Sequence, residues 1–301
     1  MLRPMLSVVV GSLLATSLFA QAPAAPKIDF PAASPTATFK QRVGLTDIEV
    51  EYSRPSVKGR KIFGDMLAYG SVWRTGANSA TKITFSTAVK FGGVDVPAGT
   101  YALFSIPGQT EWTVILNKVP GQWGSYSYDA KNDIARTAVK PIALTTPVET
   151  FSIGLADLRD ESATLYLTWE KTRVPVALGF DVTSSLVPQI EAVMASDEPK
   201  KPYFSAAMFY YDHNLDLKKA SAWITTAAAQ PGQFQFVMLY YKGVILAKVG
   251  DNAGALSAAQ QSLELVANQS GELKDEYTRK NNAVIATVSA PTNTKVKVTV
   301  P

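Results

Sequence analysis

The sequence predicts an antiparallel β-sandwich or barrel followed by a small domain built from helix pairs. Apolar residues alternate with period two from about residue 37 to 182, and the pattern becomes helical after Asp181. Within the helical part, one stretch repeats at an offset of 35 residues. Strands alternate side chains between two faces, whereas helices repeat every ~3.6 residues, so the change of period predicts a change of structural class. We therefore expect a β-domain at 37–182 and a helical domain at 183–290.

The first 22 residues have the pattern of a cleavable signal peptide. Arg3 precedes an apolar stretch from Met5 to Ala20, and small residues follow it. The alternative is a membrane anchor, but the stretch is shorter than the ~20 residues of a helical span. No cysteine follows for lipid attachment. The pattern predicts a periplasmic or secreted protein that is not a lipoprotein and keeps no stable membrane span after cleavage. Residues 23–36, rich in Ala and Pro, predict an extended linker.

The β-domain pattern predicts about eight short strands. Ile48, Val50 and Tyr52 alternate with acidic residues, and Gly92-Gly93 lies between two apolar runs as in a hairpin turn. Similar runs lie around 83–85, 101–106, 112–116, 151–155, 165–169 and 174–178. Helical stretches long enough to connect parallel strands are absent between these runs, which favours antiparallel pairing.

The helical part contains a weak internal repeat. NLDLKKASAWITTAAAQPG aligns with VGDNAGALSAAQQSLELVA, so that Asp216 matches Asp251 and Ala220 matches Ala255. Both stretches resemble the tetratricopeptide repeat, whose period is ~34 residues. Small residues such as Gly243 would let two helices approach closely. A last helix in GELKDEYTRKNNAVIATV would cap the stack, and residues 291–301 form a tail.

Composition excludes several kinds of site. The 301 residues include no cysteine and one histidine, which rules out thiolate-bound zinc and iron–sulfur clusters, and we expect no cofactor. The formal net charge of +4 is spread along the chain, unlike the clustered charge of a nucleic-acid binder. His213 falls between two predicted helices, where we expect a surface turn rather than a member of a catalytic triad.

Carboxylates offer an alternative, enzymatic interpretation. A hydrolase could use a pair such as Asp65 and Asp129. Asp47, Glu49 and Glu51 share one strand face and are typical of a solvated surface. The segment DAKND at 129–133 has acidic residues that could bind calcium, but it lacks the spacing and glycine of a dedicated loop. We therefore expect no metal site.

A basic loop is the first candidate binding segment. SRPSVKGRKIFG places Arg54, Lys58 and Arg60 close together between Pro and Gly residues. Arginine side chains suit carboxylate or phosphate recognition. The alternative is a solvated loop with salt bridges to Asp65.

Two further segments add aromatic and polar candidates. In VWRTGAN, we expect Trp73 to anchor a corner while Arg74 and Asn78 face a ligand. In QWGSYSYD, Trp123 and Tyr126 lie around a glycine and could stack on sugar rings or hold a peptide. The alternative is a loop that buries its own rings.

Several of these strings together resemble the DUF2911 family. They are SRPSVKGRKIFG, LAYGSVWRTGANSATKITFS, VPAGTYALFSIPGQTEWTVILNK and QWGSYSYD, with FYYDHNLDLKKASAWI downstream. The resemblance runs from about residue 37 to at least 230. It implies an exported bacterial protein. It assigns no activity and no role to the loop residues that match.

The sequence thus favours a binding module over an enzyme. The ligand would be anionic, carbohydrate-like or a peptide, held by the eight candidates Arg54, Lys58, Arg60, Trp73, Arg74, Asn78, Trp123 and Tyr126. The alternatives are a carboxylate-dependent hydrolase and a structural scaffold whose helical repeats bind a protein partner. We expect no nucleic-acid partner.

Overall fold

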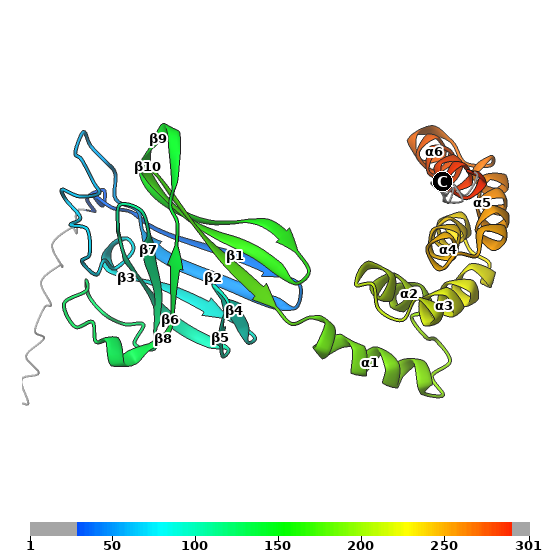
Figure 1. The fold of residues 1–301 in the computed structure, drawn as a ribbon, viewed down its shortest axis with the longest axis horizontal. Coiled ribbons are helices and arrows are strands. Elements are labelled where there is room, and N and C mark those ends of the chain that lie inside the picture. The colour runs from blue at the N-terminus through cyan, green and yellow to red at the C-terminus, as the bar shows by residue number, and fades with distance from the viewer. Residues whose placement is uncertain (1–28, 291–301) are drawn as a thin grey trace, which may run out of the picture.

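A computed structural model describes residues 29–290 of the chain. The predicted signal peptide, residues 23–28 of the linker and the tail at 291–301 lie outside the described residues. Ten strands occupy the N-terminal part and six α-helices the C-terminal part (Figure 1). The prediction of strands followed by helices is confirmed.

The larger sheet has six strands, and every neighbouring pair is antiparallel. In spatial order they are β1 (Thr36–Val43), β2 (Thr46–Ser53), β3 (Ala77–Phe85), β6 (Gly99–Ile106), β7 (Trp112–Asn117) and β8 (Asp133–Val139). A short 3-10 turn, η1 (Ala130–Asn132), precedes β8.

The smaller sheet has four strands, two of them long. Its spatial order is β5 (Val94–Val96), β4 (Val89–Phe91), β10 (Ser162–Phe180) and β9 (Ile142–Arg159). The prediction of short strands was wrong here, because β9 has 18 residues and β10 has 19. The apolar runs at 165–169 and 174–178 belong to one strand, whose pairing with β9 shifts register near Glu170.

The two sheets share one hydrophobic core. Val50 and Ile83 of the larger sheet and Leu167 and Val176 of the smaller sheet belong to the same buried cluster. Aromatic rings fill one end of it, where Trp73 stacks on Trp169 with ring centroids 5.8 Å apart. These residues occupy the inward positions of the period-two pattern, because burying apolar surface is the main favourable term in folding.

The outer face of the larger sheet carries a second, smaller cluster. Ala80, Ala102, Phe104 and Ile115 are buried there. The segment 118–132 covers them, and the ring of Tyr128 meets Phe104 edge-on with centroids 5.1 Å apart. Part of the outer face is therefore covered by a loop, and the loop margin defines the candidate site below.

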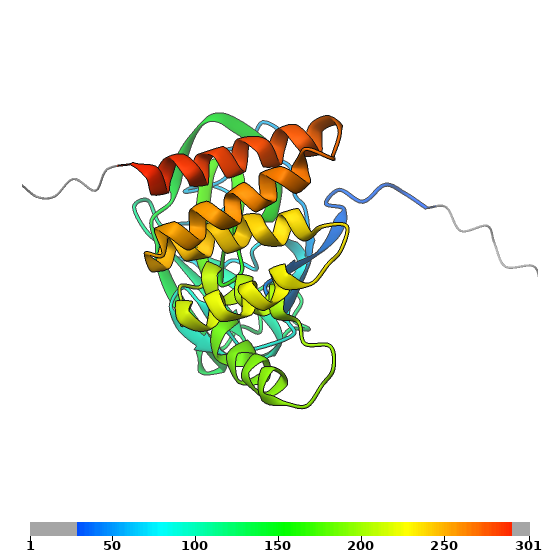
Figure 2. The same ribbon diagram turned by 90° about the vertical axis from the view of Figure 1, so that its right-hand side faces the viewer.

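Six helices follow the strands. They are α1 (Thr183–Ala195), α2 (Tyr203–Asp212), α3 (Leu217–Ala229), α4 (Gln235–Val249), α5 (Asn252–Val266) and α6 (Gly271–Ser289). From α2 onward the helices stack in chain order, each against the next (Figure 2). Among the described residues, no helix is long and apolar enough to cross a membrane.

The two aligned stretches occupy equivalent structural positions. Asp216 caps α3 by accepting hydrogen bonds from the backbone N–H groups of Lys218 and Lys219, at 3.0 and 3.2 Å. Asp251 caps α5 in the same way through the N–H of Gly254, at 2.9 Å. Ala220 and Ala255 are both fully buried. An added Cβ on Gly243 would lie 3.2 Å from the carbonyl oxygen of Ala255, so this glycine permits the close approach of α4 and α5.

The helices meet the strands at one small junction. Leu186 of α1 and Phe209 of α2 pack against the core of the two sheets. The predicted turn at His213 is present and follows α2, but the side chain is not on the surface, since it is only 10% exposed. Its ring packs on Phe209, with centroids 4.2 Å apart, and its Nε2 lies 3.8 Å from a carboxylate oxygen of Asp160.

Candidate functional site

A groove opens on the outer face of the larger sheet, where β2 ends and β3 begins. Its volume is about 460 Å³. Its lining combines one exposed tryptophan with neutral polar groups and one carboxylate: Thr36, Glu51, Tyr52, Ser53, Asn78, Ser79, Ala80 and Trp123. Two of the predicted site residues, Asn78 and Trp123, meet here although they lie 45 positions apart in the sequence.

A bulge in β3 creates the groove. Glu51 of β2 pairs with Lys82, but Ser53, two residues later, pairs with Ala77, five residues from Lys82. Three additional residues of β3 are therefore accommodated, and such bulges bend a strand and redirect its side chains. Asn78 lies in this bulge with φ of 60°, a left-handed conformation that asparagine tolerates better than most residues. Its Nδ2 donates to Ser53 Oγ at 3.2 Å.

Backbone pairing brings the tryptophan to the bulge. The N–H of Ala80 donates to the carbonyl of Gln122 at 2.9 Å, and the N–H of Gly124 donates to that of Asn78 at 3.0 Å. Trp123 lies between these two bonds, and 66% of its surface is exposed. The interpretation of a loop that buries all its own rings therefore does not apply to Trp123.

Tyr126 lies next to this platform. Its surface is 85% exposed. Gly124 lies directly beneath the ring, since an added Cβ at Gly124 would lie 2.6 Å from Cε2 of Tyr126. Tyr126 is outside the groove lining, but it belongs to the loop that carries Trp123.

Asn117, at the end of β7, holds this loop in place. Its Oδ1 accepts from the N–H of Val119 at 3.1 Å and from Gln122 Nε2 at 3.2 Å. Its Nδ2 donates to the carbonyl of Asp129 at 3.1 Å and to Asp133 Oδ1 at 2.9 Å. Asn117 is fully buried. Sequence reasoning did not identify this residue; the available signal was a polar side chain that ends the apolar run WTVIL.

A charged cluster supports the far side of the same loop. Asp133 Oδ2 accepts from Tyr128 Oη at 2.6 Å and from Arg136 Nη1 at 2.7 Å. Burial and the neighbouring Asp133 carboxylate raise the pKa of Tyr128 to about 12. Asp129 Oδ1 accepts from the N–H of Lys131 at 3.0 Å and caps η1. The acidic groups of the 129–133 segment thus hold the loop together, and residues 29–290 contain no cluster of three or more metal-ligating side chains.

The arginines of the basic loop donate to backbone carbonyls and do not line the groove. Arg54 Nε donates to the carbonyl of Phe151 at 3.0 Å. Arg60 folds back on its own loop and donates to the carbonyls of Val57 and Ser56, at 3.0 and 2.6 Å. The backbone N–H of Lys58 donates a hydrogen bond to Glu149 Oε1 at 2.8 Å. The expected salt bridges to Asp65 are not formed, and none of the three basic residues lines the groove.

Trp73 and Arg74 also lie outside the groove. Trp73 is 4% exposed, and its Nε1 donates to the carbonyl of Gly76 at 3.0 Å. It anchors a corner of the core, fully rather than partly buried, and has no free face for a ligand. Arg74 is half-buried. Its Nε is buried without a hydrogen-bond partner among the described residues.

The carboxylates proposed for hydrolysis do not meet in the groove. Asp65 and Asp129 are both exposed and neither lines it. Glu51 is the carboxylate in the lining, and Lys82 Nζ lies 2.7 Å from its Oε1.

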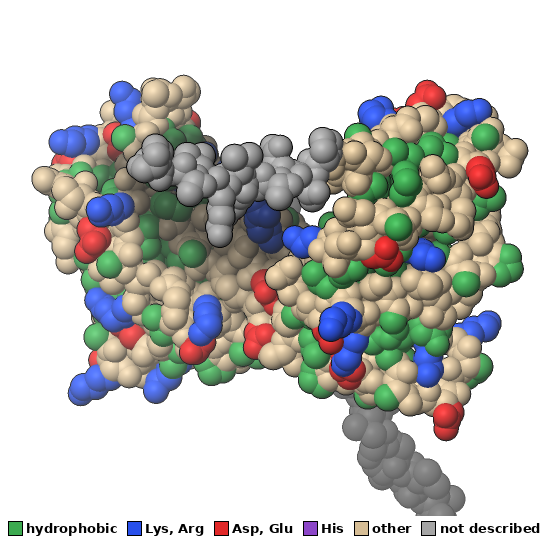
Figure 3. Space-filling model, turned by 45° about the vertical axis from the view of Figure 1, so that its right-hand side comes forward, with side chains coloured by type: hydrophobic (Ala, Val, Ile, Leu, Met, Phe, Trp, Pro, Cys, Tyr) green, Lys and Arg blue, Asp and Glu red, His purple; other side chains and the backbone are tan. Residues whose placement is uncertain are grey.

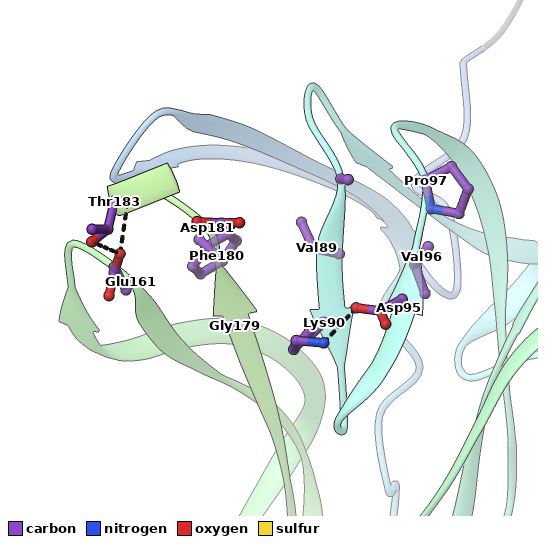
Figure 4. A pocket seen from close by; sticks show the side chains of 11 residues that line it. Val89, Lys90, Asp95, Val96, Pro97, Glu161, Gly179, Phe180, Asp181 and Thr183 are labelled. Carbon is purple, nitrogen blue, oxygen red and sulfur yellow. Dashed lines mark hydrogen bonds and ion pairs between the residues drawn. The ribbon is translucent and has the colours of Figure 1, made fainter. Parts of the chain in front are cut away.

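A larger cavity of about 840 Å³ lies where β10 leads into α1 (Figure 4). Val89, Val96 and Phe180 provide apolar surface. Charged groups of this cavity already have partners within the protein. Lys90 Nζ forms a salt bridge with Asp95 Oδ1 at 2.5 Å, and Glu161 accepts a hydrogen bond from the N–H of Thr183 at 2.8 Å. The hydrogen bonds from Thr183 lower the pKa of Glu161. None of the predicted site residues reaches this cavity.

The part of the chain that matches a known family contains the strands and not the helices. Residues 34–178 match a family model described as "Protein of unknown function (DUF2911)". The match begins just before β1 and ends within β10, so it contains both sheets and supports the resemblance seen in the loop motifs. The helices α1–α6 lie outside it. No curated protein and no solved structure matches the chain.

Proposed function

We propose that the DUF2911 region of this chain, residues 34–178, is a carbohydrate-binding module whose site is the groove between β2, β3 and Trp123. One observation carries the proposal: an exposed tryptophan lies beside neutral polar side chains on a bulge in a rigid sheet. A sugar ring has an apolar face that can pack on an indole. Its hydroxyl groups can exchange hydrogen bonds with Asn78, Ser53 and Ser79.

The same lining disfavours the other two ligand classes. An anionic ligand needs free cationic donors, but Arg54 and Arg60 bind backbone carbonyls and the groove lining contains no Lys or Arg. A peptide bound by strand addition would need the free edge of β1, and only Thr36 of the groove lining belongs to that strand, whereas β2 and β3 are paired on both sides. The usual glycosidase mechanism needs two carboxylates across the scissile bond, and the groove lining contains one, Glu51, which forms a salt bridge with Lys82. We therefore favour binding over catalysis.

Two architectural assignments accompany this proposal. The shared core supports a β-sandwich of the two sheets, and the equivalent caps at Asp216 and Asp251 support tetratricopeptide-like pairs at 183–290. Export to the periplasm or secretion rests on residues 1–22 alone, which lie outside the described residues.

A second function, a protein-binding scaffold, is favoured by the small junction. Leu186 and Phe209 are the helical residues that pack against the sheet core, so α3–α6 keep surface that the strands do not cover. Partly buried Phe204, Tyr240 and Tyr241 pack on one another at the α2–α4 contact, with ring centroids 4.9 to 5.6 Å apart. If the helices bind a protein partner, substitutions near Tyr241 should disrupt that binding, and substitutions near Trp123 should not.

Glycan-array binding of the full chain, followed by titration calorimetry, tests the carbohydrate proposal. We expect Trp123→Ala to weaken binding about tenfold or more, because truncating an anchoring aromatic costs about 2 kcal/mol or more. Phe234→Ala is the matched control, since it removes another exposed aromatic ring, at the start of α4. Equal binding by wild type and Trp123→Ala, or no glycan bound at all, contradicts the proposal.

A further inference from the structure

We infer that the groove is one end of an elongated site and that its ligand is an extended, uncharged polysaccharide chain rather than a single sugar. This inference rests on the proposed function and specifies its ligand.

The groove continues along the outer face of the larger sheet. A second hollow, of about 230 Å³, is lined by Glu49, Glu51, Lys82, Thr84 and Thr100. Glu51 lines both hollows, so they adjoin. Thr84 and Thr100 are directly paired on β3 and β6, and their Oγ1 atoms lie 2.9 Å apart.

The combined track follows the strands. Asn78 lies at one end and Thr84 at the other, six residues along β3. At a rise of about 3.3 Å per residue this separation is roughly 20 Å, somewhat less across the bulge. A single sugar ring would leave most of this length empty, whereas a chain of several rings would occupy it with Trp123 stacked at one end.

The charges of the second hollow are balanced only when Lys40, a neighbour outside its lining, is counted with the lining residues Glu49, Glu51 and Lys82. Lys82 Nζ lies 2.7 Å from Glu51 Oε1, and Lys40 Nζ lies 3.0 Å from Glu49 Oε2. Two ammonium groups thus balance two carboxylates, and Figure 3 shows the same close mixing of acidic and basic side chains elsewhere on the molecule. Sugar hydroxyls both donate and accept, so they can bind either member of such a pair. An acidic polysaccharide would meet Glu49 and Glu51 without a surplus of cations.

The short side chains of Thr84 and Thr100 leave open the space that forms the second hollow. Thr84 pairs with the longer Glu49 of β2 on one side and with Thr100 of β6 on the other, and Lys82 lies two residues before Thr84 on β3. Because the two threonines are small and hydroxylated, they leave room for a ligand and offer it hydrogen bonds. The threonine pair is therefore the part of the track that a short ligand bound at Trp123 would not reach.

The experiment measures affinity against chain length, using β-1,4-linked gluco-oligosaccharides from the disaccharide to the hexasaccharide. If the array ranks another neutral sugar first, the oligomers of that sugar replace them. We expect the hexasaccharide to bind about tenfold or more tighter than the disaccharide, and polygalacturonate to bind more weakly than either neutral chain. In the Thr84→Ala/Thr100→Ala double variant, the gain with length should fall by about tenfold while disaccharide affinity stays unchanged. Thr113→Ala, which removes another threonine of the same sheet, is the control.

The outcomes separate this inference from the function on which it rests. If saccharides bind through Trp123 but affinity does not rise with length, or the double variant binds long chains like wild type, the elongated site is wrong and the binding module stands. Tighter binding of polygalacturonate overturns the neutral-chain assignment. If no saccharide binds to the wild-type protein, both proposals fall.

Discussion

Gln122 donates from its side-chain Nε2 to Oδ1 of Asn117 across 3.2 Å, and both side chains are buried. Trp123 follows Gln122 directly and is the most exposed tryptophan of the candidate site. A buried amide pair therefore anchors the residue that precedes the surface ring that we assign to ligand stacking. Such support reduces the entropy that a loop loses when it binds a ligand.

Asn117→Ala should destabilise the protein and loosen the Trp123 loop. The substitution removes four hydrogen bonds and leaves buried polar groups without partners, which costs about 2 kcal/mol or more. Urea unfolding measures the stability loss, and hydrogen exchange of residues 118–132 measures the loosening. Lys131→Ala, on the exposed surface of the same loop, should change neither quantity. Unchanged exchange in Asn117→Ala would show that the backbone pairing at 79 and 123 alone holds the loop.

Trp73→Ala and Trp123→Ala should separate stability from binding. Trp73 stacks on Trp169 within the core, so its truncation should cost about 3–5 kcal/mol of folding stability. Trp123 is largely exposed, so its truncation should change stability by no more than about 0.5 kcal/mol while it weakens glycan binding. Chemical denaturation of both variants provides the comparison. A strong destabilisation by Trp123→Ala would show that this ring is a packing element of the loop.

Folding stability should fall as the pH rises from about 10 to 12, in part through Tyr128. Its pKa in the folded protein is raised to about 12, above the ordinary value of 10.0, because it is partly buried and bonded to Asp133. The folded state therefore retains this proton at pH values where the unfolded chain loses it. The contribution is fully present below pH 10 and is lost by about pH 12.

Tyr128→Phe should make this alkaline fall shallower, as measured by urea unfolding at a series of pH values. A residual fall should remain, because burial and Glu191 also raise the pKa of Tyr210 to about 12. Tyr126→Phe is the control, since that ring is exposed on the same loop. Identical profiles for wild type and Tyr128→Phe would exclude the contribution of Tyr128.

The caps at Asp216 and Asp251 should contribute equally to the helical part. Asp216 accepts two backbone hydrogen bonds and Asp251 accepts one at the start of its helix, and each Asp→Ala substitution should cost about 1 kcal/mol. Thermal unfolding of both variants measures this cost, and Asp275→Ala within α6 should have little effect. A marked difference between the two caps would contradict the structural equivalence of the aligned stretches.

Much of the fold was predictable because its determinants are local. Alternation of Ile48, Val50 and Tyr52 identifies the inward face of β2, and all three are buried. The correspondence of Asp216 with Asp251 was visible from the repeat, whereas their role as helix caps came from the structure. The length of β10 was not predictable, because its continuity through Glu170 depends on pairing with a distant strand, β9.

The site was harder to predict because exposure and partners depend on tertiary contacts. Trp73 and Trp123 both lie near glycines in loop-like segments, yet the first is in the core and the second is on the surface. Arg60 has a side chain suited to anion binding, but two of its five N–H donors already bind carbonyls of its own loop. Asn78 was predicted to face a ligand and lies in the groove; the bulge that places it there arises from the register between β2 and β3.

The bulge at Asn78–Thr81 divides β3 into two parts: one part pairs with β2 and fills the core, and the other lines the groove. Beyond it, Ile48–Phe85 and Val50–Ile83 keep their register through ordinary ladder pairing, and these residues fill the core. Positions 78 and 79 carry exposed polar side chains that the core does not contact. A library randomised at position 79, and limited at position 78 to residues that tolerate a φ of 60°, should therefore yield folded proteins that differ in which sugars they select. The same division would allow ligand preference to diversify among related chains while the architecture stays constant.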